Sequence, residues 1–315
     1  MKYVQYLNEL INKRISATEQ LVIFGQNIAA GSCLSGLTRG LKIRKGGLII
    51  NTPNSENTLV GLGFGMMFGG VSSVFFMKQQ DFLLLGIDQL VDTYNFIRRK
   101  DPKASFTIVF IIVDDGYSGL QSSLNNFGDF CSMARIPGFT ITNKLDAKEI
   151  INTNIVSPGF RIIGVSQRLF NTELQEMNKI YSNDEKTIFQ YTEGDGATIA
   201  CFNLSFPYGL ELHNKLKEKN IESSLFSVNA LTPVIWDKII ENAKKTKNLV
   251  IIDDSKSENL SCDNLAACAL EQCALDNKIV IRRKFLSNDW LFPNADQLSI
   301  DYSGIINKLS RAIKK

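Results

Sequence analysis

The stretch "FTIVFIIV" at residues 106–113 is apolar at nearly every position. A half-buried strand would alternate apolar and polar residues, so this run predicts a strand covered on both faces, at the centre of a mostly parallel sheet. Similar short runs occur along the first half of the chain, and helical stretches separate them. This alternation predicts an α/β fold. We expect strands at 21–24, 47–50, 71–77, 106–113 and 138–141, with helices between them that include 56–70 and 82–100.

A second set of the same kind follows after residue 195. The polar, irregular segment 165–195 between the two sets is typical of a linker. We therefore expect two domains, each a mostly parallel sheet flanked by helices, at residues 1–164 and 196–315. The strands expected in the second domain are 198–202, 223–228, 248–253 and 278–283, and its helices are about 207–219, 233–245 and 261–275.

Composition excludes several classes of protein. The chain has 315 residues, 44% hydrophobic and 21% charged, with a net charge of +3, which is normal for a globular protein with a sizeable core. Such a mild charge gives no reason to expect nucleic-acid binding. No apolar run reaches the length of about 18 residues that a transmembrane helix needs. Residues 1–14 form an amphipathic pattern without a signal-peptide cleavage motif. We expect a cytoplasmic protein with no membrane partner.

Two patterns that could indicate metal or phosphate binding have simpler interpretations. The six cysteines form no Cys-x-x-Cys pair and His213 is the single histidine, so we expect no metal site and interpret the cysteines as small buried residues. "GLGFG" at 61–65 lies inside a helical run, which favours close packing over a phosphate-binding turn. "GDG" at 194–196, with Asn229 further on, is the arrangement by which thiamine-diphosphate enzymes hold magnesium. A polar turn before the strand at 198–202 is the simpler interpretation.

Glu56 stands at the head of the apolar, glycine-rich run 55–70, and no further charge follows until Lys78. In one interpretation Ser55 or Asn54 caps a helix, and Glu56 lies in its first turn, where the helix dipole favours a negative charge. In the other, the carboxyl group faces a dry cavity, where carboxyl groups hold protons tightly and bond strongly to a ring nitrogen. Spacing alone does not choose between the two.

Several stretches resemble a known family. "INTPNSENTLVGLGFGMMFGG" (50–70), "DFLLLGIDQLVDTYNFIRRK" (81–100) and "ARIPGFTITNKLDAKEII" (134–151) are similar to the β subunit of 2-oxo-acid dehydrogenase decarboxylase components and to the C-terminal half of transketolases. "DGATIACFNLSFPYGLELHNKLKEKNIESSLFSVNALTPV" (195–234) resembles the C-terminal domain of that family. The resemblance covers nearly the whole chain. It implies a pyrimidine-binding domain followed by a transketolase-type C-terminal domain.

The resemblance implies roles for particular residues. In that family the first domain binds the aminopyrimidine ring of thiamine diphosphate at a subunit interface. Glu56 matches the glutamate that bonds a pyrimidine nitrogen and favours the imino tautomer, which generates the ylid. Phe82 matches the aromatic residue that stacks on the pyrimidine, and Asp88 and Gln89 match a pair interpreted as structural. Gln26, in "FGQN", stands where the family normally has an acidic residue at the cofactor.

A second departure lies in the loop "GYSGLQSSLNN" at 116–126, where the family normally has a histidine that handles protons and substrate. This loop has none, and either Gln121 or Asn125 takes its place, depending on where the gap falls. The departure leaves three alternatives: a partner supplies the proton donor, the reaction differs, or activity is lost.

The chain also lacks the diphosphate-binding domain of the family. The resemblance therefore implies an α-type subunit that holds Mg²⁺ and the diphosphate, and a β–β contact that completes a heterotetramer. We expect a β-type subunit of a thiamine-diphosphate-dependent enzyme, active only with its partner, that cleaves a 2-oxo acid or ketose donor and transfers the acyl or ketol fragment. The alternative is a catalytically degenerate paralogue that serves as a structural partner. Gln26 and the absent histidine favour this alternative, whereas Glu56 and Phe82 favour the enzyme.

Overall fold

The computed structural model describes residues 1–231, 235–284 and 298–313, and the chain divides into two compact units, Met1–Glu176 and Met177–Lys315. The boundary falls inside the segment 165–195 that was expected to be a linker. Residues up to 176 pack with the first unit, where the Tyr3 amide donates a 2.9 Å hydrogen bond to the Thr172 carbonyl. Short apolar pieces such as Leu169 and Phe170 are buried there, and they were hidden among polar neighbours in the sequence.

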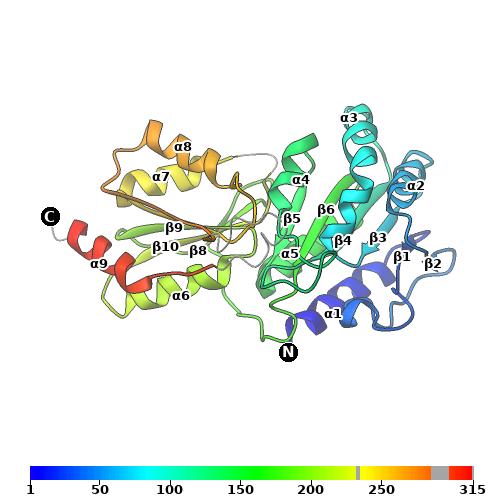
Figure 1. The fold of residues 1–315 in the computed structure, drawn as a ribbon, viewed down its shortest axis with the longest axis horizontal. Helices are drawn as coiled ribbons and strands as arrows, with labels where there is room; N and C mark the ends of the chain where they lie inside the picture. The colour runs from blue at the N-terminus through cyan, green and yellow to red at the C-terminus, as the bar shows by residue number, and fades with distance from the viewer. Residues whose placement is uncertain (232–234, 285–297, 314–315) are drawn as a thin grey trace. The chain divides into compact units, whose positions relative to one another are not determined.

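The first unit contains a six-stranded sheet in the order β2-β1-β3-β4-β6-β5, and every neighbouring pair is parallel. Helices α2, α3 and α4 cover one face and α1 and α5 the other (Figure 1). All eight residues of β4 are buried, as the unbroken apolar run predicted. The strands are β1 (Val22–Gly25), β2 (Leu48–Asn51), β3 (Ser73–Met77), β4 (Ser105–Ile112), β5 (Gly138–Ile141) and β6 (Gly159–Ser166), and the helices are α1 (Tyr3–Ser16), α2 (Glu56–Phe68), α3 (Tyr94–Ile97), α4 (Phe127–Ala134) and α5 (Lys144–Asn154).

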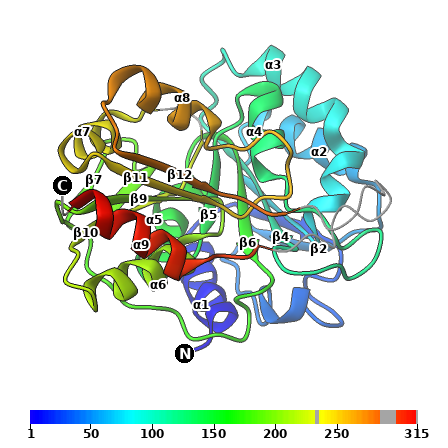
Figure 2. The same ribbon diagram turned by 60° about the vertical axis from the view of Figure 1, so that its left-hand side comes forward.

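The second unit contains another six-stranded sheet, in the order β12-β11-β9-β10-β8-β7. Its first four strands are mutually parallel, whereas β8 pairs antiparallel with β10 and β7 pairs antiparallel with β8 at one edge. Helices α7 and α8 lie on one face and α6 and α9 on the other, as Figures 1 and 2 both show. The strands are β7 (Tyr181–Ser182), β8 (Ile188–Thr192), β9 (Ala197–Phe202), β10 (Ser223–Val228), β11 (Asn248–Asp253) and β12 (Asn277–Ile281), and the helices are α6 (Phe206–Lys217), α7 (Asp237–Thr246), α8 (Asp263–Gln272) and α9 (Tyr302–Ile313).

The predicted α/β class with two mostly parallel sheets is confirmed, and the expected helix at 82–100 corresponds to a helical stretch at residues 80–97 whose hydrogen-bond pattern changes along its length. It is a 3₁₀ segment, η2 (Gln80–Gly86), a π-helical turn, η3 (Gln89–Thr93), and the short α3. The 3₁₀ segment packs closely on α2, because a Cβ added at Gly86 would lie 2.8 Å from Cγ2 of Val60. Strands β6, β7 and β8 were not expected at all.

Strand order marks the edge where ligands bind in such sheets. From β1 the chain moves outward to β2 and then returns past β1 to β3, so β1 and β3 flank a topological switch point. Ligands of open α/β sheets bind outside the carboxyl ends of the strands at such a point. In the second unit the corresponding point lies between β9 and β11.

None of the helices in the described ranges has the length and apolar character that a membrane crossing requires.

Candidate functional site

Three residues singled out in the sequence follow the carboxyl ends of three adjacent strands. Gln26 comes directly after β1, Glu56 starts the helix that follows β2, and Phe82 lies in η2 just after β3. Because these strands are parallel, their carboxyl ends share one edge of the sheet, at the switch point between β1 and β3. The fold therefore gathers Gln26, Glu56 and Phe82 at the edge where a ligand is expected.

Glu56 is the first residue of α2 and is only 8% exposed. No hydrogen bond or ion pair joins its carboxylate to another residue in the described ranges. The expected cap is absent, because the Ser55 hydroxyl donates to Oγ1 of Thr58 at 3.0 Å and caps no backbone amide. The helix dipole favours a negative charge at this position. Glu56 is thus a largely buried acid, at a helix N-terminus, without a partner in the described part of the chain.

The glycines behind Glu56 allow close packing, as predicted for "GLGFG". A Cβ added at Gly63 would lie 2.2 Å from the Phe106 ring, and one at Gly61 would lie 3.3 Å from Oε1 of Gln89. Both glycines lie inside α2, where the amides bond within the helix, so a phosphate-binding turn at 61–65 is excluded. A Cβ at Gly65, by contrast, meets nothing within 4 Å.

Phe82 lies in η2, the segment that packs on α2. Its side chain is largely buried, at 8% exposure, and its segment η2 packs on α2 through Gly86, where an added Cβ would lie 3.5 Å from the Glu56 carbonyl oxygen. Asp88 and Gln89 make contacts consistent with the expected structural role. The Gln89 amide donates to Asp88 at 3.2 Å, and its Oε1 accepts from the Thr93 hydroxyl at 2.7 Å.

Gln26 is placed by the glycine before it. Gly25 has φ +149°, and a Cβ there would lie 2.1 Å from the Phe76 carbonyl oxygen. Only glycine allows β1 to approach β3 so closely at this point. The loop after Gln26 is held by Asn51, whose Oδ1 accepts hydrogen bonds from the Ile28 and Ala29 amides at 2.9 and 3.1 Å. The half-buried Gln26 therefore sits at a fixed turn at the carboxyl edge.

Asp81 is a residue that sequence reasoning missed. Its Oδ1 accepts hydrogen bonds from the Ser123 amide at 2.9 Å and the Ser123 hydroxyl at 3.0 Å, and its Oδ2 accepts from the Leu124 amide at 3.2 Å. The neighbouring Gln80 accepts from the Asn126 amide at 3.1 Å. These contacts fix the loop 116–126 to the segment that carries Phe82. The available signal was a carboxylate directly before Phe82, just beyond a buried strand.

The structure separates the two loop candidates. Gln121 is exposed, next to a tight turn in which the Ser122 amide donates to the Gly119 carbonyl at 3.0 Å. Asn125 is fully buried, at 0% exposure. Gln121 is therefore open to solvent, whereas Asn125 belongs to the packed base of the loop.

A cavity of about 400 Å³ opens at the same edge, beside the ends of β1, β3 and β6. Its lining includes Asn27, Lys78, Gln79 and Gln167, and Lys78 is the only charged residue among the described residues that line it. None of the sequence-predicted site residues is among them, although Asn27 directly follows Gln26.

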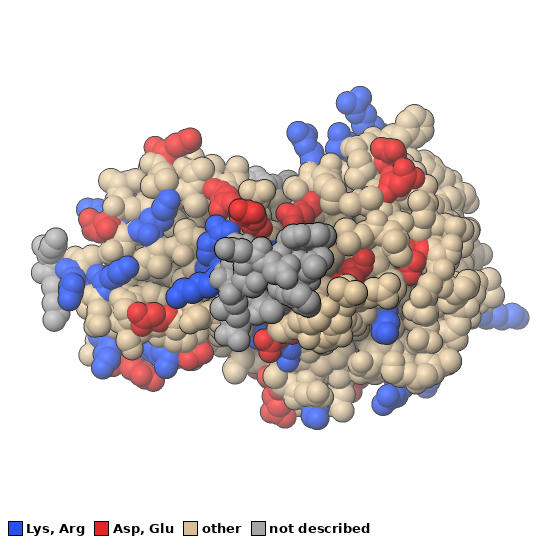
Figure 3. Space-filling model, in the orientation of Figure 1, with Lys and Arg blue, Asp and Glu red and all other residues tan. Residues whose placement is uncertain are grey.

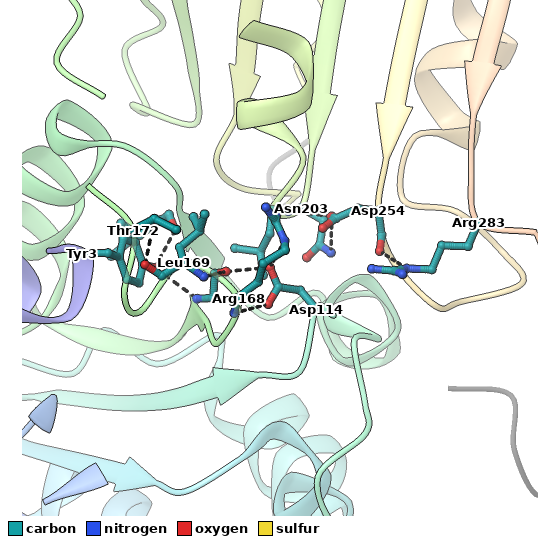
Figure 4. Close-up of polar contacts among 11 residues, drawn as sticks. Tyr3, Asp114, Arg168, Leu169, Thr172, Asn203, Asp254 and Arg283 are labelled. Carbon is teal, nitrogen blue, oxygen red and sulfur yellow. Dashed lines mark hydrogen bonds and ion pairs between the residues drawn. The ribbon is translucent and has the colours of Figure 1, made fainter. Parts of the chain in front are cut away.

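A buried polar network closes the ends of β4 and β6 (Figure 4). Asp114 accepts from the Ser166 hydroxyl at 2.6 Å and forms an ion pair with Nε of Arg168 at 3.2 Å. The Tyr3 hydroxyl accepts from the Ser166 amide at 3.1 Å and donates to the Ile141 carbonyl at 2.7 Å. Burial raises the pKa of Tyr3 well above its usual value. These groups satisfy one another, so we interpret the network as structural.

In the second unit the "GDG" motif does not form a metal site with Asn229. Residues 194–196 precede β9, whereas Asn229 follows β10, and these two strands are parallel. The motif and Asn229 therefore lie at opposite edges of the sheet, about 20 Å apart for six-residue strands. A Cβ at Gly194 would lie 2.4 Å from the Ser223 amide nitrogen, so the motif is a tightly packed turn, as the simpler interpretation held.

The switch point of the second unit is filled by the chain itself. Asn203, after β9, donates from Nδ2 to Oδ1 of Asp254, after β11, at 2.9 Å, and the Leu204 amide donates to the same oxygen at 2.9 Å. Arg283, after β12, donates to the Asp254 carbonyl at 2.7 Å (Figure 4). These contacts link the segments that follow β9, β11 and β12.

His213 lies on α6, where it is 6% exposed, and its Nδ1 is 2.8 Å from the Ser223 hydroxyl. Burial lowers its pKa below the usual value. The six cysteines are free thiols, three of them buried. No group of three or more histidine, cysteine, aspartate or glutamate residues suited to a metal ion occurs within the ranges that the structure describes.

No protein-family model matches the chain, but individual relatives do. It is 21% identical over 292 residues to the β subunit of 2-oxoisovalerate dehydrogenase of Bacillus subtilis, covering 90% of this chain and 88% of that protein. It is also 21% identical over 278 residues to the β subunit of acetoin:2,6-dichlorophenolindophenol oxidoreductase of Cupriavidus necator, covering 84% and 82%. This chain is a homologue of 2-oxo-acid dehydrogenase β subunits. The resemblance stated from the sequence is thereby confirmed.

Solved structures agree on the fold of this β-subunit homologue. It is similar to a split-gene transketolase, described as an inactive β4 tetramer, with a TM-score of 0.67 and 11% identity over 98% of this chain and 97% of that one. A 2-oxoglutarate:ferredoxin oxidoreductase from Magnetococcus marinus gives a TM-score of 0.65 and 9% identity, over 99% of this chain and 65% of that chain.

On the face drawn in Figure 3 basic and acidic side chains are interspersed, with groups of basic side chains at the end of α3 and left of the centre of the view. This pattern fits the mild net charge of +3.

Proposed function

We propose that this chain is the β-type subunit of a thiamine-diphosphate-dependent enzyme that cleaves a 2-oxo acid or ketose donor and transfers the acyl or ketol fragment. One observation carries the proposal. Glu56, largely buried and without a partner in the described ranges, starts a helix at the switch-point edge, beside the segment that carries Phe82. The relatives, which are β subunits of 2-oxo-acid dehydrogenases by name, support it.

The residues present fit the aminopyrimidine half of the cofactor. Glu56 offers a largely buried carboxyl oxygen to a ring nitrogen, and Phe82 offers an aromatic face next to it. When bound, thiamine diphosphate supplies a nucleophilic carbon that attacks the substrate carbonyl. Glu56 holds a proton between its carboxyl oxygen and the ring nitrogen, and the low exposure of this region excludes water from that contact.

In this proposal the neutral amides of Gln26 and Gln121 change the chemistry of the site. Gln26 replaces an acid with a neutral amide at the switch point, so Glu56 is the single acid among the proposed cofactor contacts. Gln121 is the loop position open to a substrate, and its amide orients a neutral oxygen without releasing a proton. Asn125 supports the loop from its buried base.

A partner subunit is supported by the outer face of α2. This helix is apolar all round, which is typical of a helix buried on every side. In the described chain, however, Leu62 is 49% exposed and Phe68 50% exposed, and Gly65 between them leaves room for a close neighbour. We infer that an α-type subunit covers this face and holds Mg²⁺ and the diphosphate. Its close approach brings these groups to the end of α2 that carries Glu56.

The proposal extends to assembly and location. A β–β contact completes a heterotetramer of two α-type and two β-type subunits. A cytoplasmic location is supported by the six free thiols, since reducing compartments keep cysteines unpaired.

A second candidate function is that of a degenerate paralogue that only supports its partner. Two observations favour it: the amide at Gln26 and a loop at 116–126 without a histidine. The two candidates differ in what the assembled complex does with the cofactor, because a structural paralogue does not need the Glu56 carboxyl group.

Calorimetric titration of thiamine diphosphate with Mg²⁺ tests the proposal. We expect weak binding to the isolated chain and binding at least a hundredfold tighter to the complex with its α-type partner. Tight, magnesium-dependent binding by the isolated chain would contradict the shared site. A complex that binds no cofactor would favour the structural paralogue.

A further inference from the structure

A second cavity, of about 290 Å³, lies at the opposite edge of the sheet of the first unit. Its lining includes Pro137 and Phe139 at the start of β5, Phe160 and Arg161 at the start of β6, and Tyr94 on α3. This edge carries the amino ends of the parallel strands. Glu56, in contrast, follows the carboxyl end of β2, at the other edge. The cavity is therefore separate from the proposed cofactor site.

Arg161 is a buried cation without an acid among the described residues. It is 6% exposed, and its guanidinium donates to the Asn154 carbonyl at 2.9 Å, to Oγ1 of Thr107 at 3.4 Å, and to the carbonyls of Ser157 and Pro158. These carbonyls, at the end of α5 and just after it, hold the guanidinium in place but carry no net charge. Burial lowers the pKa of Arg161 to about 10. A buried charge without a counter-ion is unfavourable.

Two further cations line the same cavity. Arg98 and Lys100 follow α3, where Figure 3 shows basic side chains gathered, and neither forms an ion pair with a described residue. The Arg98 guanidinium donates only to the Ala134 carbonyl, at 3.2 Å, within the described ranges. The Tyr94 hydroxyl also lines the cavity and makes no hydrogen bond to the described chain. No carboxylate is among the described lining residues, so the charges and the hydroxyl lack an anionic partner there.

The rest of the lining is apolar and rigid. The Tyr94 and Phe160 rings pack with centroids 5.2 Å apart, and Ile97 and Met67 extend the apolar wall. Three of the seven prolines of the chain, Pro102, Pro137 and Pro158, lie at the cavity, where their fixed φ angles limit movement. Small-molecule sites combine such apolar walls with a few convergent polar groups, and this volume is near the lower limit of about 300 Å³.

We propose that this cavity binds a small organic anion, with a single carboxylate or phosphate head beside Arg161, Arg98 and Lys100 and an apolar body against Phe160 and Phe139. The head supplies the missing counter-ion and accepts a hydrogen bond from the Tyr94 hydroxyl. The site belongs to this chain alone and depends on neither the cofactor nor a partner subunit.

Isothermal titration of the full chain, without cofactor and at constant ionic strength in sodium chloride, tests the proposal. The probes are phenyl phosphate, benzoate and inorganic phosphate. We expect one saturable site for at least one of the two organic anions, with inorganic phosphate at least tenfold weaker than the organic anion that binds more tightly. Tighter binding of phenyl phosphate identifies a phosphate head, and tighter binding of benzoate identifies a carboxylate head.

Matched variants assign the binding to the cavity. The double variant Arg98→Gln/Lys100→Gln, at exposed positions, is expected to weaken binding at least tenfold, and Tyr94→Phe severalfold. Arg99→Gln/Lys103→Gln removes the same charge from neighbouring residues outside the lining and is expected to leave the affinity within twofold. The proposal is overturned if neither organic anion saturates, if inorganic phosphate binds as tightly as the tighter-binding organic anion, or if the two double variants behave alike.

Discussion

The Asp81 carboxylate accepts a 2.9 Å hydrogen bond from the Ser123 backbone amide, and this contact fixes the loop 116–126 to the segment that carries Phe82. The two residues are 42 positions apart in the chain. Asp81 thus couples the proposed pyrimidine contact to the proposed substrate loop, through η2, and acts as a positioning residue for both.

Asp81→Ala is expected to release this loop. It removes the acceptor of three hydrogen bonds from Ser123 and Leu124, and we expect a loss of about 2 kcal/mol in the free energy of unfolding. Amide hydrogen exchange should accelerate at residues 116–126 while the β4 amides stay protected. Asp81→Asn, which keeps one acceptor oxygen, is the control and should have a smaller effect. Equal protection of the loop in wild type and Asp81→Ala would contradict the assignment.

Two glycines of α2 give a matched pair. Gly63→Ala places a methyl group 2.2 Å from the Phe106 ring and should destabilise the isolated chain by about 1–3 kcal/mol. Gly65→Ala meets nothing within 4 Å, so its better helix propensity should stabilise the isolated chain by up to about 1 kcal/mol. Urea unfolding measures both.

The same pair tests the partner surface. If an α-type subunit packs closely on α2, Gly65→Ala should weaken assembly in sedimentation equilibrium although it stabilises the isolated chain. Unchanged assembly would show that this face is not covered closely.

Buried His213 predicts a pH dependence of stability. Burial, the largest cause, lowers its pKa from 6.5 in the folded state, although the nearby Glu222 opposes the shift. Below pH 6.5 the unfolded chain therefore binds a proton that the folded chain resists, so stability falls as pH falls. We expect the melting temperature to drop more for wild type than for His213→Gln between pH 7.5 and 5.5. Parallel curves for the two proteins would rule out this contribution.

Loop variants distinguish the two candidate positions for a histidine. Gln121→His, at an exposed position, should fold normally and shift products of the assembled enzyme from transfer towards simple decarboxylation, because imidazole donates a proton that the amide does not. Asn125→His introduces a larger ring at a fully buried position and should lower the melting temperature. Product analysis with a panel of 2-oxo acids and ketose phosphates shows whether Gln121→His shifts the products. An unchanged ratio of products in Gln121→His would remove the proposed role of this amide.

Much of the fold could be predicted from the sequence, because strands that are buried on both faces appear as unbroken apolar runs. The strand predicted at 106–113 is shifted by one residue from the observed bounds of β4, and the strand predicted at 138–141 has the same bounds as β5. Strand β6 was missed because Arg161 interrupts its apolar run. That charge is tolerated through carbonyl contacts at the end of α5, which no local pattern reveals.

The sequence could predict those features of the candidate site that depend on the order of strands and helices along the chain. Glu56 could be placed at a helix start, and strand order then brought it to the same edge as Gln26 and Phe82. The role of Asp81 could not be predicted, because it depends on a loop that only the folded chain brings near. For the same reason the sequence left Gln121 and Asn125 as equal candidates, and burial separates them.

The most direct test of the central claim is exchange of the thiazolium proton of thiamine diphosphate for deuterium in the complete complex, with wild-type chain and with Glu56→Gln. This nearly isosteric change keeps the size of the side chain and removes the proton that the carboxyl group shares with the ring nitrogen. We predict an intact complex whose exchange slows by at least about a hundredfold, the magnitude typical of losing a positioned acid or base. Equal exchange rates in the two complexes would contradict the account and reduce Glu56 to a residue of the first helical turn.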